Sequence, residues 1–162
     1  MKRLDPTDLD YFTTAPIRIV ASGTVPAPPA AVFAALADAA SWPRWFPLMH
    51  RAAWTEGAAA VGAEREVALR LLGRFRERMI AWEPGARFAF TMVGSTSPLA
   101  RQMAEDYRLT AVADGTQLDW LMAATPTTLG RVARPALMAI GRKLFRDMRR
   151  GLAAHLAANP GR

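Results

Sequence analysis

The sequence predicts a single α+β domain in which a curved antiparallel sheet packs around one long C-terminal helix. Three observations support this fold class. The chain has 162 residues, 51% of them hydrophobic, which suits one sizeable core but is too short for two ordinary domains. Its middle is a run of strand-like segments broken by turn residues, with no helix-length periodicity between them. Its end carries a long amphipathic stripe typical of a surface helix.

The chain is expected to begin with an N-terminal arm over residues 1–16, which are mostly polar. Leu9, Tyr11 and Phe12 are the side chains expected to dock this arm onto the domain. Residues 17–25 alternate between apolar and polar side chains, which predicts the first strand of the sheet.

Two short helices are predicted after this strand. The first runs from the prolines at positions 28 and 29 to about residue 39, because proline is tolerated in the first helical turn. The second covers about residues 41–46, with Ser41 as its expected N-cap.

Six more strands are predicted after the second helix, so that the sheet has seven strands. Glycine and proline bound each segment, and Asp114-Gly115 is a strong signal for a hairpin. Such consecutive short strands predict an antiparallel meander. The predicted strands cover residues 49–56, 64–72, 75–83, 86–94, 102–112 and 116–124.

A long helix is predicted over residues 129–157, followed by a flexible tail over 158–162. Pro135 cannot donate to the helical ladder, so either a kink or a short first turn with a fresh start is expected there. The apolar stripe of the helix consists of Leu137, Ile140, Leu144, Met148 and Leu152.

Composition excludes several classes of site. The chain has no cysteine, so it has no disulfide, thiolate metal site or cysteine nucleophile. Its two histidines, His50 and His155, are far apart in the sequence, and we expect neither a metal nor another cofactor. The start of the chain lacks an apolar signal core, and three prolines interrupt the uncharged stretch 19–37. We therefore expect a cytoplasmic location.

The net charge of +7 raises the question of an anionic partner. Neither an RNA-binding strand signature nor helix-turn-helix spacing accompanies the basic residues, which makes nucleic acid an unfavoured partner. A solvated helix face is the preferred interpretation, and an anionic membrane surface is a less favoured one. The sequence does not specify the oligomeric state. The basic residues of the last helix are Arg142, Lys143, Arg146, Arg149 and Arg150.

Four motifs occur in an order typical of a known superfamily. They are VPAPPAAVFAALAD at 25–38, WPRWFP at 42–47, WEPGARF at 82–88 and GTQLDW at 115–120. With these motifs, residues 17–157 resemble the START-like superfamily, also called SRPBCC, which has the helix-grip fold of the birch-pollen-allergen proteins. Within it, the chain is most similar to the bacterial polyketide cyclase/dehydrase and lipid-transport group.

This resemblance implies a ligand-binding domain over residues 17–157, with a cavity between the sheet and the C-terminal helix. Different members of the superfamily use that cavity for lipids, polyketides, sterols, quinones or plant hormones. The motifs mark the geometry of the scaffold rather than a reaction, so they leave the chemistry open.

Alternation of side chains assigns the residues that face this cavity. Charged residues set the phase of each strand, as Glu64, Glu66 and Arg70 do for the strand 64–72. The residues turned inward by this rule are Val67, Leu69, Leu71, Phe88, Phe90, Met92, Leu118, Trp120 and Met122. The helices are expected to add Trp45, Phe46, Leu137, Ile140 and Leu144. Such a wall is suited to an adaptable apolar ligand, although each residue can equally be plain core.

Two acidic residues share the inward phase. Glu77 alternates with Met79 and Ala81, and Glu105 alternates with Tyr107, whose hydroxyl makes it a further ligand contact. A buried carboxylate is costly unless it is paired or protonated, and this cost is also how enzymes raise a carboxyl pKa. The alternatives are that a β-bulge turns the acids outward, or that an arginine neutralises them. Arg78 and Arg101 are the expected arginines.

Three functions remain open. The preferred one is non-catalytic binding or carriage of a small hydrophobic, lipid-like or polyketide-like molecule. The second is a cyclase or dehydratase that moves protons with Glu77, Glu105, Tyr107 and His50. The third is a membrane-associated quinone or lipid chaperone that uses the basic helix. Whether Glu77 and Glu105 converge on one cavity discriminates between the first two.

Overall fold

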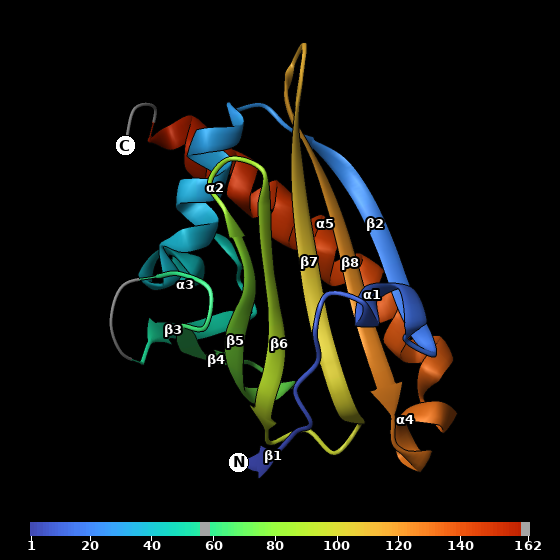
Figure 1. Ribbon diagram of the computed structural model, residues 1–162. Helices are drawn as coiled ribbons and strands as arrows, with labels where there is room; N and C mark the ends of the chain where they lie inside the picture. The colour runs from blue at the N-terminus through green and yellow to red at the C-terminus, as the bar shows by residue number, and fades with distance from the viewer. Residues whose placement is uncertain (56–58, 160–162) are drawn as a thin grey trace.

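The computed structural model describes residues 1–55 and 59–159. Its main strands are β2 (Ile17–Val25), β3 (Met49–Trp54), β4 (Glu64–Leu69), β5 (Gly73–Glu83), β6 (Arg87–Ser95), β7 (Ala100–Val112) and β8 (Gly115–Pro126). They form one sheet in the order β2-β8-β7-β6-β5-β4-β3, and all its neighbouring strands are antiparallel. The sheet curves around the long helix α5 (Arg134–Ala158), as Figure 1 shows. The predicted helix-grip fold is confirmed.

The seven predicted strands all form. Residue 56, the expected end of the 49–56 strand, lies outside the described residues, as do 57, 58 and the end of the expected tail, 160–162. An eighth strand, β1 (Lys2–Arg3), was not predicted and joins the sheet beside β6.

The turn between β4 and β5 comes earlier than predicted, at residues 70–72 instead of 73–74. Leu71 at its tip has a φ of 69°, and Gly73 has a φ of 99°. This left-handed conformation is unfavourable for leucine because its Cβ crowds the next carbonyl oxygen. The Leu71 side chain is fully exposed, so its expected inward orientation is wrong. The alternation that holds along β4 ends where this turn begins.

Three short helical segments connect β2 to β3. They are α2 (Pro29–Ala37), the 3₁₀ helix η1 (Ala39–Ser41) and α3 (Trp42–Trp45). The predicted cap at Ser41 is wrong, because its side chain does not bond to the first turn of α3. The hydroxyl instead donates to the carbonyl of Asp38 at 2.8 Å and accepts a hydrogen bond from Trp45 Nε1 at 3.0 Å. Ser41 therefore fixes the position of a tryptophan ring.

The C-terminal helix is divided as one of the two alternatives at Pro135 predicts. A short helix α4 (Thr128–Val132) ends, and α5 starts afresh at Arg134 with Pro135 in its first turn. The missing N–H of proline falls among those that a first turn leaves unpaired. No helix in the described part of the chain is both long and apolar enough to cross a bilayer.

Glycines let α5 approach its neighbours closely. A Cβ atom at Gly151 would lie 1.7 Å from the carbonyl oxygen of Trp45, and one at Gly141 would lie 3.0 Å from Cδ1 of Ile19. The backbone of α5 thus touches α3 directly, and Gly141 brings the helix close to β2. This contact sets how far the helix stands from the inner face of the sheet.

The N-terminal arm fills a gap in the sheet. Pairing between β6 and β7 ends at Thr91 and Ala104, and beyond this point β1 pairs with Gly94 and Ser95 of β6. Leu4 follows β1 and is buried in the main core, with 2% of its surface exposed. The arm therefore contributes to the core on the inner side of the sheet.

The rest of the arm packs on the outer face of the sheet. Tyr11 and Phe12 of α1 (Tyr11–Thr14) are buried there, as expected, whereas Leu9 is exposed and does not dock. They pack against a group of buried alanines that includes Ala81. The inward orientation expected for Ala81 is wrong, because a register shift between Met79 and Ala81 reverses the alternation of β5.

Candidate functional site

A cavity of about 160 Å³ lies between the inner face of the sheet and α5. Its wall is mostly apolar and comes from β2 to β8, α3 and α5. Nine of the predicted ligand contacts are part of this wall, namely Phe46, Leu69, Phe90, Met92, Tyr107, Met122, Leu137, Ile140 and Leu144. Strand alternation predicted five of these nine residues, and the predicted helices supplied the other four.

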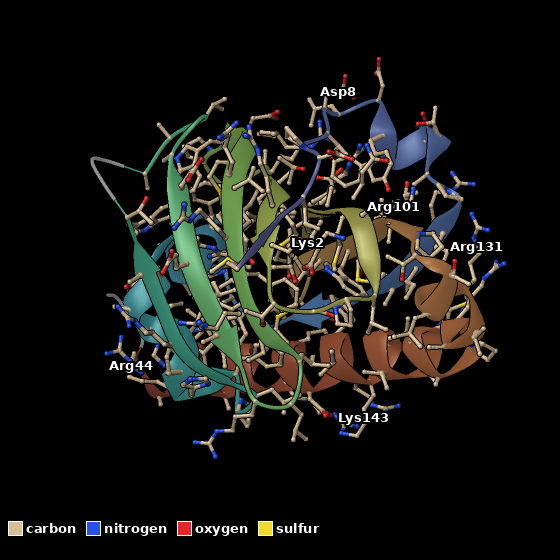
Figure 2. The ribbon with its side chains drawn as sticks, turned by 90° about the horizontal axis from the view of Figure 1, so that it is seen from below. Lys2, Asp8, Arg44, Arg101, Arg131 and Lys143 are labelled. Atoms are coloured by element: carbon tan, nitrogen blue, oxygen red, sulfur yellow. The ribbon has the colours of Figure 1, made fainter. Side chains whose placement is uncertain are left out.

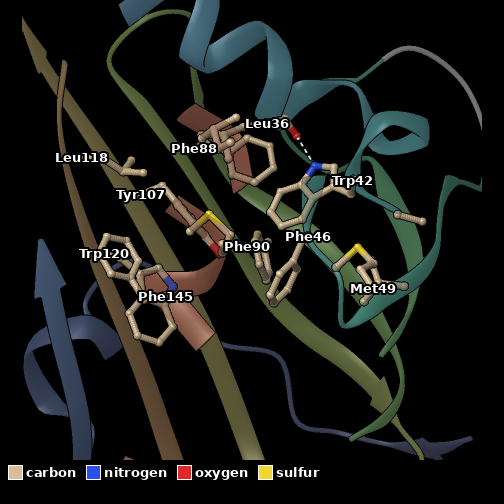
Figure 3. Close-up of a cluster of buried hydrophobic side chains, with 14 of the residues drawn as sticks. Leu36, Trp42, Phe46, Met49, Phe88, Phe90, Tyr107, Leu118, Trp120 and Phe145 are labelled. Carbon is tan, nitrogen blue, oxygen red and sulfur yellow. Dashed lines mark hydrogen bonds between the residues drawn. The ribbon is translucent and has the colours of Figure 1, made fainter. Parts of the chain in front are cut away.

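Five other predicted contacts are buried in the core without lining the cavity: Trp45, Val67, Phe88, Leu118 and Trp120. Figure 3 shows Trp120 against Phe145 of α5, with the two rings stacked at a centroid distance of 5.5 Å. Phe88 contacts Phe90 and Tyr107 on one side and the side chains of the α2–α3 region on the other. These residues support the wall from behind.

The deep end of the cavity holds a buried ion pair that the sequence analysis missed. Arg65 on β4 and Glu77 on β5 are opposite each other in the register, and Arg65 Nε donates to Glu77 Oε2 at 2.5 Å. Both side chains are almost fully buried, and both line the cavity. The expected partners Arg78 and Arg101 do not fill this role, since Arg78 pairs with Glu64 on the surface and Arg101 is exposed.

Aromatic rings surround the guanidinium group of Arg65. Its Cζ atom lies 4.7 Å from the ring centre of Trp42, 5.0 Å from that of Phe90 and 5.1 Å from that of Phe88. Such faces attract a cation and replace part of its lost hydration. Among the described residues, none accepts a hydrogen bond from Arg65 Nη1, which is buried. The arginine therefore retains unused donor capacity beside the cavity.

A second carboxyl group faces the same cavity from β7. Glu105 Oε2 accepts hydrogen bonds from the Tyr107 hydroxyl at 2.7 Å and from Trp120 Nε1 at 2.9 Å. Glu105 and Glu77 both line the cavity, so the two acids converge as the discriminating test requires. The alternative that a bulge turns them outward is wrong for both residues. Trp120, predicted as a ligand contact, here positions Glu105.

Burial changes the acidity of this cluster. Desolvation, and to a lesser extent the nearby Glu105, raise the pKa of Glu77 to about 7 against the opposing attraction of Arg65. Desolvation also raises the pKa of Glu105, while hydrogen bonds from Tyr107 and Trp120 oppose this change. The pKa of Tyr107 lies well above 10, because burial and Glu105 both disfavour a phenolate. One cation thus faces two carboxyl groups, and near neutral pH one of them tends to keep a proton.

The remaining candidate, His50, is not part of this cluster. It lies exposed on β3 and does not line the cavity, so its predicted contribution to the site is wrong. No group of three or more histidine, aspartate or glutamate side chains gathers as a metal site within residues 1–55 and 59–159.

The opposite end of the cavity reaches the surface. Its lining there includes Leu72 after the β4–β5 turn, Leu99 before β7, and Arg134, Leu137 and Ile140 on α5. These side chains are half-buried or exposed, unlike those around Arg65. We call this end the mouth. The cavity therefore has a charged, buried inner end and an opening lined by apolar side chains and the exposed Arg134.

Comparisons with known proteins agree with this architecture. The sequence model of a family described as "Polyketide cyclase / dehydrase and lipid transport" matches residues 16–159. The uncharacterized protein Rv2574 of Mycobacterium tuberculosis is 32% identical over 157 residues, which cover 93% of each chain.

Solved structures give the same fold at low sequence identity. The Zhui aromatase/cyclase from a Streptomyces species has a TM-score of 0.75 and 17% identity, over 90% of this chain and 98% of that one. TTHA0849 from Thermus thermophilus has a TM-score of 0.76 and 13% identity, over 90% and 100%. Ara h 8.0201 has a TM-score of 0.70 and 15% identity, over 88% and 99%.

Proposed function

Because the chain belongs to the polyketide cyclase/dehydrase and lipid-transport family of the START-like superfamily, we propose that it binds and carries a small apolar molecule with one anionic, oxygen-bearing end. The observation that carries this proposal is Arg65, a fully buried arginine that lines an otherwise apolar cavity and whose Nη1 has no partner among the described residues. A carboxylate or enolate oxygen is the natural acceptor for such a group.

The dimensions of the cavity limit the ligand. At about 160 Å³ it is smaller than the roughly 300–1,000 Å³ of sites for drug-sized molecules. A short chain or a small system of one or two rings therefore suits it. Since the only buried cation lining the cavity within the described chain is at its inner end, the ligand would lie with its polar end beside Arg65 and its apolar end toward the mouth.

Displacement of a fluorescent naphthalene sulfonate by octanoic acid and by 1-octanol tests the proposal. We expect the acid, measured above its own pKa, to bind roughly tenfold or more tightly, because a hydrogen bond to a charged group contributes about 1.5–3 kcal/mol. The double variant Arg65→Met/Glu77→Leu should bind both compounds equally, since an apolar pair of similar size can replace a buried ion pair without loss of the fold. The matched control, Arg78→Gln/Glu64→Gln, removes a surface pair and should keep the preference. Equal affinity of the unaltered protein for both compounds would contradict the proposal.

Orientation can be measured with tryptophan fluorescence. Trp42 lies at the inner end, and no tryptophan lies among the mouth residues. Octanoic acid brominated beside its carboxyl group should therefore quench the protein's emission more strongly than octanoic acid brominated at its terminal carbon. Stronger quenching by the terminal bromide would mean that the ligand lies the other way round.

The second candidate is proton transfer on a carbonyl compound, and the convergence of Glu77, Glu105 and Tyr107 favours it. A carboxyl group with a pKa of about 7 can act as a base near neutral pH. Glu77 would take a proton from the carbon next to a ketone, and Arg65 would hold the resulting enolate oxygen. Deuterium exchange into acetylacetone, followed by NMR, tests this chemistry. Exchange that is faster than in buffer and that disappears in Glu77→Gln supports an enzyme. Exchange at the rate of the buffer alone supports a carrier without this activity.

A further inference from the structure

Exposed apolar side chains gather beside the mouth of the cavity. Leu71 and Val132 are the two most exposed large apolar residues of the described chain, at 101% and 80%. Leu71 lies at the tip of the β4–β5 turn, between Leu69 and Leu72, which both line the cavity. Val132 ends α4, two residues before the lining residue Arg134.

Two further features connect these residues to the mouth. Leu129 of α4 and Ile140 of α5 are also exposed, at 55% and 42%, and Ile140 lines the cavity. A Cβ atom at Gly130 would lie 2.0 Å from the carbonyl oxygen of Leu99, so α4 sits directly against the segment that precedes β7. We call Leu71, Leu129, Val132 and Ile140, with the arginines beside them, the mouth surface.

The segments that form this surface carry charges of one sign. The three segments that meet at the mouth come from residues 67–76, 84–104 and 120–146, and none of these ranges contains an aspartate or glutamate. Arg70 and Arg131 lie beside Leu71 and Val132, both arginines are exposed, and neither forms a salt bridge with a described acidic side chain.

Figure 2 looks onto this end of the molecule. Arg131 and Lys143 lie on the side of α4 and α5, whereas Asp8 of the N-terminal arm lies on the opposite, outer side of the sheet. The nearest acidic side chain on α5 is Asp147, which pairs with Lys143. Asp8 therefore does not interrupt the mouth surface.

We propose that the mouth surface docks onto an anionic lipid bilayer. Exposed leucine, isoleucine and valine can enter the boundary of the acyl chains, while arginines beside them attract anionic headgroups. A bilayer fits better than a protein partner because the exposed apolar side chains of a turn and two helices stand beside arginines that form no salt bridge with a described acidic side chain. The proposal rests on the proposed function only in that the cavity behind this surface holds an apolar molecule.

The structure also limits which basic residues of α5 can take part in docking. Arg149 is not freely solvated, because its side chain packs over Gly23 and donates to the carbonyl oxygen of Thr24 at 2.7 Å. Arg146 and Arg150 are exposed but lie beyond the cavity-lining part of α5. The docking determinant is therefore the mouth, not the whole helix face.

Co-sedimentation with vesicles of phosphatidylcholine, with or without phosphatidylglycerol, tests the inference at physiological salt. We expect the unaltered protein to bind only the anionic vesicles, and less so as salt increases. Arg70→Gln/Arg131→Gln should weaken binding about fivefold for each arginine, or about 25-fold together. Leu71→Gly should also weaken it. The matched control Arg146→Gln/Arg150→Gln removes two arginines from the same protein and should weaken binding far less.

Two results would overturn the inference: no binding of the unaltered protein to anionic vesicles, or an equal loss in the control and the mouth variants. Displacement of the naphthalene sulfonate in solution keeps this test separate from the proposed function. None of the substituted residues lines the cavity, so all variants should bind that probe normally. A protein that binds the probe but not the vesicles would refute docking and leave ligand binding intact.

Discussion

Removal of the Glu77 carboxyl group should abolish a pH dependence of stability that originates inside the cavity. Glu77 is 3% exposed, and its pKa is raised from 4.5 to about 7. The folded protein therefore binds this proton more tightly than the unfolded chain does. The stabilisation of the folded state by this proton is fully present below about pH 4.5 and is lost as the pH rises through 7.

The magnitude follows from the shift. Each pKa unit corresponds to about 1.36 kcal/mol, so a rise from 4.5 to about 7 corresponds to about 3 kcal/mol in total, of which about 2–3 kcal/mol is lost between pH 5 and pH 8. The groups that face Glu77 are Arg65 on β4 and Glu105 and Tyr107 on β7. Glu105 is raised in the same direction, whereas Arg65 opposes the shift of both acids.

Urea unfolding at several pH values between 5 and 8 measures this effect in the unaltered protein and in Glu77→Gln. We expect the difference in unfolding free energy between them to change by about 2–3 kcal/mol over this range. Comparison of the two proteins cancels the pH dependence of stability that they share. Glu66→Gln is the matched control, because Glu66 is a surface residue whose pKa is lowered by Arg76. A difference that stays constant from pH 5 to pH 8 would refute the assignment of a raised pKa to Glu77.

Three further substitutions have defined expectations. Leu71→Gly should stabilise the protein by roughly 0.5–1 kcal/mol in thermal unfolding, because glycine accepts the φ of 69° and the exposed leucine loses no packing; a loss of stability would contradict the strain. Trp120→Phe should cost about 1–2 kcal/mol in urea unfolding, since it keeps the ring beside Phe145 but removes the donor to Glu105; an unchanged midpoint would contradict that role. Gly151→Ala should cost about 3 kcal/mol or more, because its Cβ would meet the carbonyl of Trp45, whereas the exposed neighbour Arg150→Ala should be nearly neutral.

The fold was predictable because its signals are local. Asp114-Gly115 marks a hairpin, Pro135 marks a helix start, and alternation along β6 and β8 turns Phe90 and Met122 inward without interruption. Where one residue breaks the local rule, prediction fails for the residues after it. The turn at Leu71 and the bulge before Ala81 are such places, and neither position has a residue type that predicts a turn or a bulge.

The site was only half predictable, and Arg65 explains why. The same alternation that turns Val67 and Leu69 inward also turns Arg65 inward, so the signal was present in the sequence. When alternation turns a charged residue inward, the usual explanation is that the inward and outward faces of the strand were assigned the wrong way round, because burying an unpaired charge costs too much free energy. The compensating groups are Glu77 on the next strand and the rings of Trp42 and Phe90. These come from distant parts of the chain, and only the folded structure brings them together.

Ligand binding and membrane docking, the two proposals, must agree on the orientation of the ligand in the cavity. An amphiphile in a bilayer has its polar end at the surface, where a docked protein sits, and its apolar chain below. It would therefore enter the mouth with its polar end first and reach Arg65 while its chain follows between Leu72 and Ile140. This is the orientation that the buried arginine independently requires. A cavity with its charge at the mouth and its apolar end inside would instead force the molecule to turn over during transfer.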